Sequence, residues 1–503
     1  MDSLTTLGVV LLLPIILIIY LRRNGKNVSA KWPPGPKTLP IIGNMHQMSG
    51  LPFRSLAELS KQYGPLMRLR LGEMETIVVS SPELAREILK ENDPCFADRP
   101  QSIGIKVLWY DYIDMAFSPY GEYWKQMRKI CMMELLSPRS VRSFASIRRD
   151  EVSGLVESIH RLSAGGEPID ISNRIFSMLS SITCRAVFGK VSKDKDTLIK
   201  ILKDGLQMAG GFEIADFFPS SVVINALSWN KLRLLMMRRR LDVILDGLIN
   251  QHRENHAEKI MGNGEFGNED LVDVLLRLQE SGELQFPIRN DNIKAVIYDM
   301  FSAGTETSAT TMDWAMTELM RNPRVMEKVQ AEVRGAYNDK TIGSMGDNDQ
   351  KLEYLKLVIK ETLRLHAPVP IVLRASREEA EINGYKIPAK VRVFVNSWAM
   401  HRDPKYWNNP ESFQPERFQG RAKELLGSGD TFDFLPFGGG KRMCPGITFA
   451  MASIELVLAH LLYHFDWKLP QGVDPQTMDM MENPGLTASR KTSLYVIPTP
   501  YKP

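Results

Sequence analysis

A single cysteine at the end of a glycine-rich loop constrains the fold of this chain more than any other feature. The loop runs from Phe437 to Gly446 with the sequence FGGGKRMCPG, and the apolar stretch from Ile447 to Phe465 directly behind it is typical of a helix. The unpaired N–H groups and positive dipole end of such a helix favour an ionised sulfur at Cys444. Three consecutive glycines let the backbone approach a flat ligand closely. The pattern therefore predicts a metal-ligating thiolate.

Two other interpretations of this cysteine are weaker. Most lone buried cysteines only fill space, and a zinc site would need paired Cys or His spacings that do not accompany Cys444. Arg442 supplies a cation suited to a carboxylate on the edge of a ligand. Phe437, Gly440, Arg442, Cys444 and Gly446 resemble the haem-binding loop of the cytochrome P450 family position by position. The resemblance implies that Cys444 ligates the iron of haem b, with Phe437 and Arg442 as further haem contacts.

The second informative feature is a long predicted helix whose centre breaks the rules for a helix. A cap near Asn290 or Asp291 and Pro323 after Asn322 set its ends, and its apolar residues predict burial. The centre nevertheless reads AGTETS over residues 303–308, a cluster of weak helix formers and polar groups. Local rules broken in the middle of a strong element are more often functional than accidental.

These central residues resemble the oxygen-activation motif of the same family. The resemblance implies that Ala303 and Gly304 open a groove over the haem, that Thr307 hydrogen-bonds dioxygen or a water beside it, and that Glu306 relays protons from solvent. An alternative based on the residues alone is that the hydroxyls back-bond to helix carbonyls and only bend the helix. Relatives that rearrange hydroperoxides do not need the acid–alcohol pair, so its presence favours dioxygen chemistry.

A third motif pairs opposite charges on one helix face. Glu361 and Arg364 are three residues apart, a spacing that usually marks a solvated surface contact. Their neighbours are apolar, however, and Arg417 follows in the segment Pro415–Phe418. Together the three charged residues resemble the Glu–Arg–Arg network of the family. The resemblance implies a buried, mutually neutralised cluster that fixes the loop leading to Cys444.

Further contacts to haem are implied by the segment after Gly121. Trp124 and Arg128 resemble the helix that donates Trp and Arg to a haem propionate, and Arg374 is a third candidate donor beside Arg442. The alternative for Trp124 is ordinary core packing. Three lysines near the same implied face either attract an acidic electron-donor protein or are simply solvated: Lys125, Lys129 and Lys441.

The amino-terminal segment predicts a membrane anchor. Leu4 to Leu21 is almost entirely apolar and as a helix would reach about 27 Å, enough to cross a hydrocarbon core. A cleaved signal is the alternative, but the start lacks a positive region and no small-residue cleavage site precedes Arg22. The basic residues that follow keep the rest of the chain in the cytosol. We therefore expect an anchor at 1–21, a basic and proline-rich hinge at 22–36, and a catalytic domain at 37–503 on the endoplasmic reticulum membrane.

Composition and the remaining patterns bound the fold class. With 44% hydrophobic residues the chain can bury a large core, and a net charge of +4 argues against nucleic acid as a partner. Its four cysteines are widely spaced, which fits free thiols in a reducing compartment. Residues 65–81 alternate like a small hairpin, and most of the chain to residue 360 has helical periodicity. The resemblance implies the cytochrome P450 fold, a single domain that is mainly α with small β-sheets.

The function follows from the same resemblance. Across nearly the whole chain the pattern resembles the plant microsomal members that decorate specialised metabolites, and residues 210–216 and 384–388 resemble its terpenoid hydroxylases. This implies a haem-thiolate monooxygenase that inserts one atom of O2 into an apolar C–H bond. No dinucleotide or flavin fingerprint is evident, so electrons from NADPH would arrive through a separate NADPH–cytochrome P450 reductase.

Other functions remain open at this point. One is an alkaloid or phenolic oxidase of the same family, and another is a haem-thiolate dehydratase or isomerase that needs no reductase. A membrane-bound haem carrier is the alternative from outside enzymology, although mere binding needs no proton relay. The implied substrate pocket is apolar and includes Ala303, Val369 and Leu486, within or beside these segments: 101–120, 208–218, the stretch before Ala303, 369–373 and 484–487.

Overall fold

The computed structural model of the protein describes residues 32–258, 270–337, 351–420 and 432–502. The predicted anchor and the basic part of the hinge lie outside the described residues. The domain is mainly helical, as predicted. Its long helices are α2 (Pro52–Tyr63), α5 (Glu122–Glu134), α7 (Ala145–Ser163), α8 (Ile171–Phe188), α9 (Lys195–Met208), α12 (Trp229–Glu258), α13 (Leu271–Ser281), α14 (Asn290–Arg321), α15 (Pro323–Ala336), α16 (Glu353–Leu365) and α18 (Ile447–His464). Shorter helices are α3 (Pro82–Arg86), α4 (Ile103–Leu108), α6 (Pro138–Ser143), α10 (Ile214–Phe217), α11 (Val222–Ala226) and α17 (Ser397–Met400).

The strands form small sheets. The largest has the order β1 (Leu66–Leu71), β2 (Met74–Val79), β7 (Arg392–Val395) and β4 (Val372–Ala375), with β2 and β7 parallel and the other pairs antiparallel. The hairpin predicted within 65–81 is therefore confirmed as β1–β2. The other sheets join β3 (Ile169–Asp170), β9 (Tyr495–Pro500) and β8 (Phe465–Lys468), and β5 (Ala380–Ile382) with β6 (Tyr385–Ile387).

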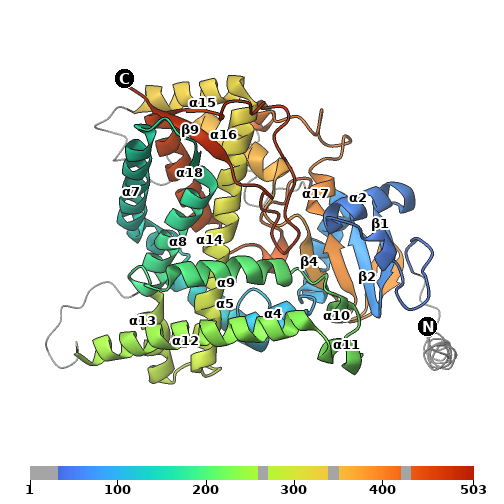
Figure 1. Ribbon diagram of the computed structural model, residues 1–503. Coiled ribbons are helices and arrows are strands. Elements are labelled where there is room, and N and C mark those ends of the chain that lie inside the picture. Colours follow the sequence, from blue (N-terminus) through green and yellow to red (C-terminus); the bar gives the residue numbers. More distant parts are fainter. Residues whose placement is uncertain (1–31, 259–269, 338–350, 421–431, 503) are drawn as a thin grey trace, which may run out of the picture.

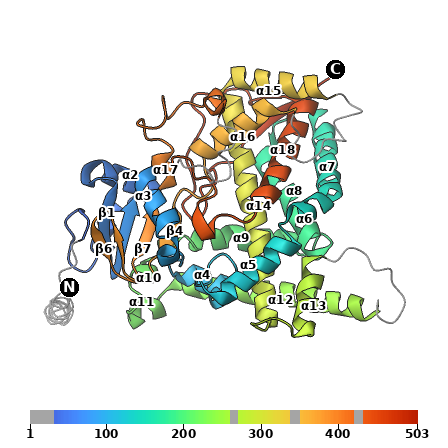
Figure 2. The ribbon, with the colours of Figure 1, turned by 180° about the vertical axis from the view of Figure 1, so that it is seen from behind.

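The largest sheet and most of the long helices occupy different ends of the molecule. Both views show β1, β4 and β7 gathered beside α2, with α7, α8 and α12 toward the other end and α14 between them (Figures 1 and 2). Helix α14 packs against α8, α16 and α18. Helix α14 therefore runs through the centre of the helical part of the domain.

Helix α14 spans Asn290–Arg321, which confirms the long helix predicted from the sequence. The cap lies one residue earlier than predicted, because the extended residue Arg289 precedes the helix and its N–H donates to the side chain of Asn292 at 2.8 Å. Pro323 ends the run, as expected, and opens α15. Most residues of α14 are buried, so a polar centre in this helix must face an internal space.

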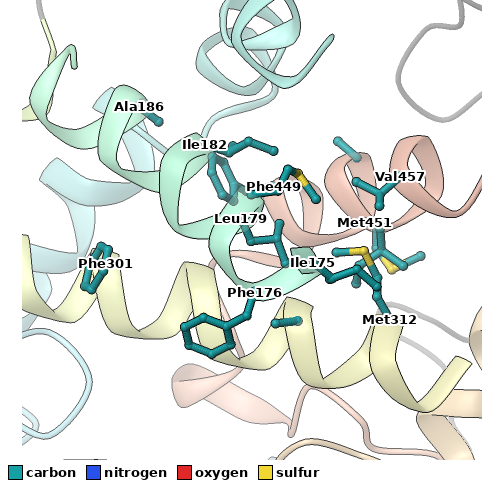
Figure 3. Packing of buried hydrophobic residues seen from close by; sticks show 14 of the residues in the cluster. Ile175, Phe176, Leu179, Ile182, Ala186, Phe301, Met312, Phe449, Met451 and Val457 are labelled. Carbon is teal, nitrogen blue, oxygen red and sulfur yellow. The ribbon is translucent and has the colours of Figure 1, made fainter. Parts of the chain in front are cut away.

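The hydrophobic core lies where α8, α14 and α18 meet. Phe176 and Leu179 of α8, Met312 of α14, and Phe449 and Met451 of α18 interdigitate there (Figure 3). Each such side chain stabilises the fold by about 1.5–3 kcal/mol through removal from water. Among the described helices, α18 is the one long and apolar enough to cross a membrane, yet 83% of it is buried, so it serves as a core helix.

The proline-rich segment is more closely tied to the domain than a free connector would be. The N–H of Arg68 in β1 donates to the carbonyl of Pro34 at 2.8 Å, and the Arg68 guanidinium lies 4.4 Å from the centre of the Trp32 ring. A Cβ at Gly35 would overlap the carbonyl oxygen of Arg68, so only glycine permits this approach. Residues 32–36 thus pack along the edge of β1.

Candidate functional site

An apolar cavity of about 300 Å³ lies between α14, the loop that carries Cys444, and β4. It brings together the residues that the sequence assigned to cofactor, chemistry and substrate. They come from segments up to about 360 positions apart in the chain and all line the cavity: Trp124, Arg128, Ala303, Glu306, Thr307, Val369, Arg374, Phe437, Arg442, Cys444 and Leu486. The polar centre of α14 faces this space, since Ala303 is exposed in the middle of a helix that is largely buried and lines the cavity with Thr307.

The loop before α18 is fixed by backbone contacts. The N–H of Cys444 donates to the carbonyl of Phe437 at 3.0 Å, which closes the loop on itself. Gly440 has a φ of +68°, and a Cβ there would overlap the carbonyl oxygen of Leu89. The N–H of Lys441 donates to a carboxylate oxygen of Asp93 at 2.7 Å. These contacts hold the sulfur in one place without a disulfide.

The electrostatics around Cys444 differ in part from the sequence-based expectation. Burial raises the pKa of the Cys444 thiol, while the N–H of Gly446 and the cations of Arg128 and Arg99 lower it. The backbone donor at the start of α18 acts as predicted, but desolvation outweighs it. The surroundings alone therefore favour the thiol, and a thiolate here requires additional positive charge of the kind that a bound metal ion supplies.

Arg128, Arg374 and Arg442 line the same cavity, and none of them forms an ion pair with another residue that the structure describes. Arg128 donates to the carbonyl of Met443 at 2.7 Å, and Arg374 donates to the carbonyl of Gly439 at 3.0 Å. Among the residues that the structure describes, Nε of Arg374 and Nη1 of Arg442 have no hydrogen-bond partner although both atoms are buried. Burial and mutual repulsion lower the pKa of Arg442 to about 9. Such orphaned donors fit the carboxylates of haem propionates, so the residues present fit haem.

Trp124 lines the cavity beside the arginines. Its indole N–H donates to the carbonyl of Met115 at 3.0 Å, so its single donor has a partner within the protein. The ring also lies 5.3 Å from the guanidinium of Arg128 and 4.4 Å from that of Arg442. These cation–π contacts orient two of the arginines, and the contact between Trp124 and haem stays a prediction.

Arg99 is a site residue that the sequence analysis missed. Its guanidinium donates to the carbonyls of Ala116 and Leu373, and it lines the cavity together with the other arginines. Burial lowers the pKa of Arg99 to about 10, so it remains cationic at neutral pH. A signal was present in the segment ADRP at residues 97–100. Its arginine had no assigned role because nothing local shows which cavity it faces.

The acid–alcohol pair is in place, with each member already hydrogen-bonded. The hydroxyl of Thr307 donates to the carbonyl of Ala303 at 2.7 Å, which is the back-bonding that the residues alone allowed. A hydroxyl that donates in this way keeps its lone pairs free to accept. Glu306 is 6% exposed and accepts from the hydroxyl of Thr487 at 3.3 Å. Burial raises the pKa of Glu306, which suits a group that holds a proton.

The predicted charge cluster is present beside the cavity and not in it. Arg364 donates to both carboxylate oxygens of Glu361 at 2.8 Å, and Arg417 donates to one of them at 2.9 Å. The Glu361 and Arg364 side chains have no exposed surface. The N–H of Gln414 adds a further bond to Glu361 at 2.9 Å. The carboxylate is therefore saturated, and the cluster ties α16 to the segment around residue 415.

The substrate side of the cavity is lined largely as expected. Val369 and Leu486 contribute, as do Trp109, Met115 and Phe117 of the 101–120 segment. Residues 208–218 do not line it, contrary to the sequence-based expectation, and Leu206 does so instead. Residues 208–218 instead contact α4. Asp216 accepts the N–H of Ile103 at 2.7 Å and so positions the start of this helix.

The domain is mainly helical, and it sets a half-buried cysteine against an apolar cavity lined by arginines with unpartnered donors. This is the arrangement that a haem-thiolate protein needs. Comparison of the sequence with known families agrees with this class. Residues 33–496 match the family described as Cytochrome P450. The chain therefore belongs to the cytochrome P450 family; it is a cytochrome P450 monooxygenase, and haem is the cofactor that the family implies.

Individual relatives extend this result. The chain is 49% identical over 508 residues to premnaspirodiene oxygenase of Hyoscyamus muticus, covering 100% of this chain and 99% of the relative. It is 50% identical over 506 residues to 5-epiaristolochene 1,3-dihydroxylase of Nicotiana tabacum, with the same coverage. A solved structure of a zebra fish cytochrome P450 with abiraterone superposes with a TM-score of 0.73 at 26% identity, covering 90% of this chain and 100% of that one.

Proposed function

We propose that this protein hydroxylates a terpenoid hydrocarbon, using O2 and electrons that a separate reductase takes from NADPH. The observation that carries the proposal is the full-length similarity to premnaspirodiene oxygenase and 5-epiaristolochene 1,3-dihydroxylase, combined with an apolar cavity that ends at Cys444. A hydrocarbon offers no polar handle, so shape and dispersion must position it. Side chains such as Val369, Phe117 and Leu486 supply such contacts.

The residues that line the cavity have different roles in this reaction. Cys444 would ligate the haem iron, and Arg374 and Arg442 would hold the propionates with their unpartnered N–H groups. When bound, haem supplies the iron centre at which O2 is reduced and activated. Glu306 holds a proton beside the cavity and passes it on, while Thr307 accepts a hydrogen bond there and orders the proton path. The apolar lining limits water at the reacting C–H bond.

We also propose that the domain lies against the endoplasmic reticulum membrane, anchored by residues 1–21. An exposed apolar patch supports this orientation. The N–H of Gly72 donates to the carbonyl of Ile42, and the N–H of Glu73 donates to that of Phe217, so the turn after β1 joins the two halves of the patch. Its exposed residues come from the segment before β1 and from α10, α11 and the start of α12: Leu39, Ile41, Ile42, Ile214, Val222, Val223, Leu227 and Trp229. Helices α10 and α11 lie below the largest sheet in Figure 1. Contiguous exposed apolar surface of this kind marks a contact with lipid or protein.

The reductase would approach the face that carries α5 and the Cys444 loop. Lys125, Lys129 and Lys441 are exposed there, which supports an acidic partner. Lys125 pairs with Glu122 at 2.6 Å, so part of its charge is offset. Lys129 and Lys441 therefore contribute more to the attraction than Lys125 does.

The experiment that tests the function uses membranes containing the full chain and a plant reductase. Premnaspirodiene, 5-epiaristolochene, an alkaloid set and a phenolic set are each supplied with NADPH, and products are identified by mass spectrometry with 18O2. We expect one labelled oxygen in a terpenoid product, dependent on both NADPH and reductase. Label only in alkaloid or phenolic products contradicts the substrate class, and unlabelled product formed without reductase contradicts the reaction.

A matched pair of cysteine variants serves as control. Cys444→Ser removes the ligand, so the carbon monoxide spectrum of the reduced protein should lose its thiolate signature and product should vanish. Cys95 is also partly exposed but does not line the cavity. Cys95→Ser should therefore keep both the spectrum and the product.

A further inference from the structure

A second cavity lies behind Glu306, and it is polar. Its volume is about 230 Å³, and its walls come from the ends of α8 and α9, from α14 and from residues 483–493. The side chains that line both this polar cavity and the apolar cavity are, among the described residues, Leu206, Glu306 and Thr487. Glu306 is the one titratable group of these three. It therefore separates a space fit for water from a space fit for hydrocarbon.

One oxygen of the Glu306 carboxyl, which lies between the two cavities, lacks a hydrogen-bond partner among the described residues. Oε1 accepts from the hydroxyl of Thr487, whereas Oε2 is buried and has no hydrogen-bond partner among the described residues. A buried carboxyl oxygen rarely stays without a partner. A polar space of this volume has room for several waters, each of which can satisfy such an atom.

The same cavity contains a second carboxyl group, that of Asp313. Asp313 lies two turns after Glu306 on α14, about 10 Å along the helix axis, which is too far for direct proton transfer. Thr310 lies between them and lines the same cavity. The hydroxyl of Ser172 donates to Asp313 at 2.6 Å. The helix thus presents an acid, a hydroxyl and a second acid in a row along one wall.

The charges around Asp313 come from every neighbouring element. Burial raises the pKa of Asp313 to about 6, Arg490 of the carboxy-terminal segment and Lys203 of α9 lower it, and Asp170 before α8 raises it. Lys203 also lowers the pKa of Glu306, and Asp313 raises it. The two acids therefore influence one another through this cavity.

The polar cavity opens to solvent. Asn173, Lys203 and Gln207 line it and are exposed. Asp313 is half-buried beside these exposed side chains, whereas Glu306 is only 6% exposed and lies where the two cavities meet.

We propose that Asp313 is the solvent-side acid that supplies protons to Glu306 through the polar cavity. A proton from bulk water binds to the Asp313 carboxylate; its O–H bond then breaks toward a cavity water, and that water passes a proton to the ionised Glu306 carboxylate. Asp313 is left ionised and is recharged from solvent, and no electrons move. Asp313 acts through Glu306 and does not touch substrate or cofactor. The proposal rests on the proposed monooxygenase function only for its kinetic test.

The kinetic test compares Asp313→Asn with Ser172→Ala. Asn keeps an oxygen that accepts from Ser172 but cannot carry a proton, whereas Ser172→Ala removes the hydrogen bond and keeps the acid. With reductase in excess, Asp313→Asn should lower kcat about tenfold with little change in KM, and Asp313→Glu should restore it. Ser172→Ala should keep most of the parental kcat, with its decline moved to higher pH because a donor that lowers the pKa of Asp313 is gone. Equal kcat values for Asp313→Asn and the parent overturn the proposal.

The pH profile gives a second kinetic readout. Asp313 ionises near pH 6, so its protonated fraction falls with rising pH and kcat of the parent should decline between about pH 6 and 8. The Asp313→Asn profile should lack this decline. A variant with the parental decline overturns the proposal, because a merely structural role for Asp313 leaves the shape of the profile unchanged.

An infrared titration of the resting holoprotein needs neither substrate nor turnover. In the parent, the carbonyl stretch of protonated Asp313 should titrate at about pH 6, and this band should be absent from Asp313→Asn. The titration of Glu306 should move to lower pH in the same variant, because a negatively charged neighbour is gone. If Asp313→Asn does not fold, the same titration is made on the surface variant Lys203→Met. It removes a cation, so both titrations should move to higher pH, and unmoved bands overturn the proposal. Failure of the terpenoid assignment leaves this readout intact.

Discussion

The imidazole Nε2 of His401 accepts a hydrogen bond from the backbone N–H of Leu435 at 2.9 Å. Its Nδ1 donates to the carbonyl of Arg364 at 3.1 Å, so both ring nitrogens are used and the ring is neutral. Arg364 belongs to the buried charge cluster, and Leu435 lies two residues before Phe437. His401 therefore connects the cluster to the loop that carries Cys444.

This connection predicts a specific loss of stability in acid. Burial and the nearby cations of Arg364 and Arg402 lower the pKa of His401 to about 3. Because the folded-state pKa lies below that of the unfolded chain, the stabilisation is complete above about pH 6.5 and is lost as pH falls toward 3. Urea unfolding at several pH values should show it. His401→Gln cannot titrate, so its free energy of unfolding should fall less steeply on acidification, by up to about 1.4 kcal/mol per pH unit. Parallel curves contradict the prediction.

The buried cluster itself predicts a large cost for losing one charge. Glu361→Gln leaves Arg364 and Arg417 without a counter-charge and should lower the free energy of unfolding by about 3–5 kcal/mol. Glu58 and Lys61 have the same three-residue spacing and a 2.7 Å contact, but both side chains are 69% exposed. Glu58→Gln should have no measurable effect. The check is chemical unfolding of both variants with haem content measured alongside. Similar losses in the two variants contradict the assignment.

Local patterns predicted much of this site. The loop before α18, the polar centre of α14, and the Glu361–Arg364 pair each occupy a few consecutive residues, so their residue types and spacing carry the information. The hairpin at β1–β2 and the ends of α14 were likewise predicted, because alternation, caps and proline act locally.

The errors concern partners that are distant in the chain. Nothing near Trp124 shows that its N–H donates to Met115, and nothing near Arg99 or His401 shows which cavity or loop each one faces. The proline-rich segment was predicted as a hinge because missing N–H donors are visible in sequence, whereas its contact with Arg68 is not. The sequence alone does not show which donor pairs with which acceptor when the two residues are distant in the chain.

Thr307→Ala should separate haem binding from productive turnover. The hydroxyl of Thr307 donates to Ala303 and keeps its lone pairs free to accept from the cavity. Its loss removes this acceptor from the proposed proton path while the helix persists. We expect normal haem content and about a tenfold fall in product formed per NADPH. Thr307→Ser should recover most of it. Thr317 makes the same back-bond to the carbonyl of Asp313 at 2.7 Å and does not line the cavity. Thr317→Ala should therefore leave coupling unchanged, and equal coupling in all variants removes Thr307 from the path.

Replacement of Arg99 should have opposite electrostatic effects on the haem-free fold and on haem binding. Without haem, burial lowers the pKa of Arg374 and of Arg442. Repulsion from the nearby cation of Arg99 lowers both pKa values further. Arg99→Leu relieves this repulsion but gives up the hydrogen bonds to Ala116 and Leu373. With haem bound, the propionates need the cations, so the loss of Arg99 costs binding. The variant should therefore weaken haem retention more than it weakens the haem-free fold.

Transfer of haem to an excess of a scavenging protein measures this retention. Arg99→Leu should lose haem at least about tenfold faster than the parent, since one charge-assisted contact contributes about 1.5–3 kcal/mol. Arg99→Lys should rescue only part of it, because the ammonium keeps the charge but lacks the rigid guanidinium fork that holds both carbonyls. Arg377 lies 3.8 Å from Asp98 at the surface and does not line the cavity. Arg377→Leu should therefore release haem at the parental rate. If Arg99→Leu also does so, Arg99 serves only to join the segments at 116 and 373, and the remaining arginines are sufficient to hold the cofactor.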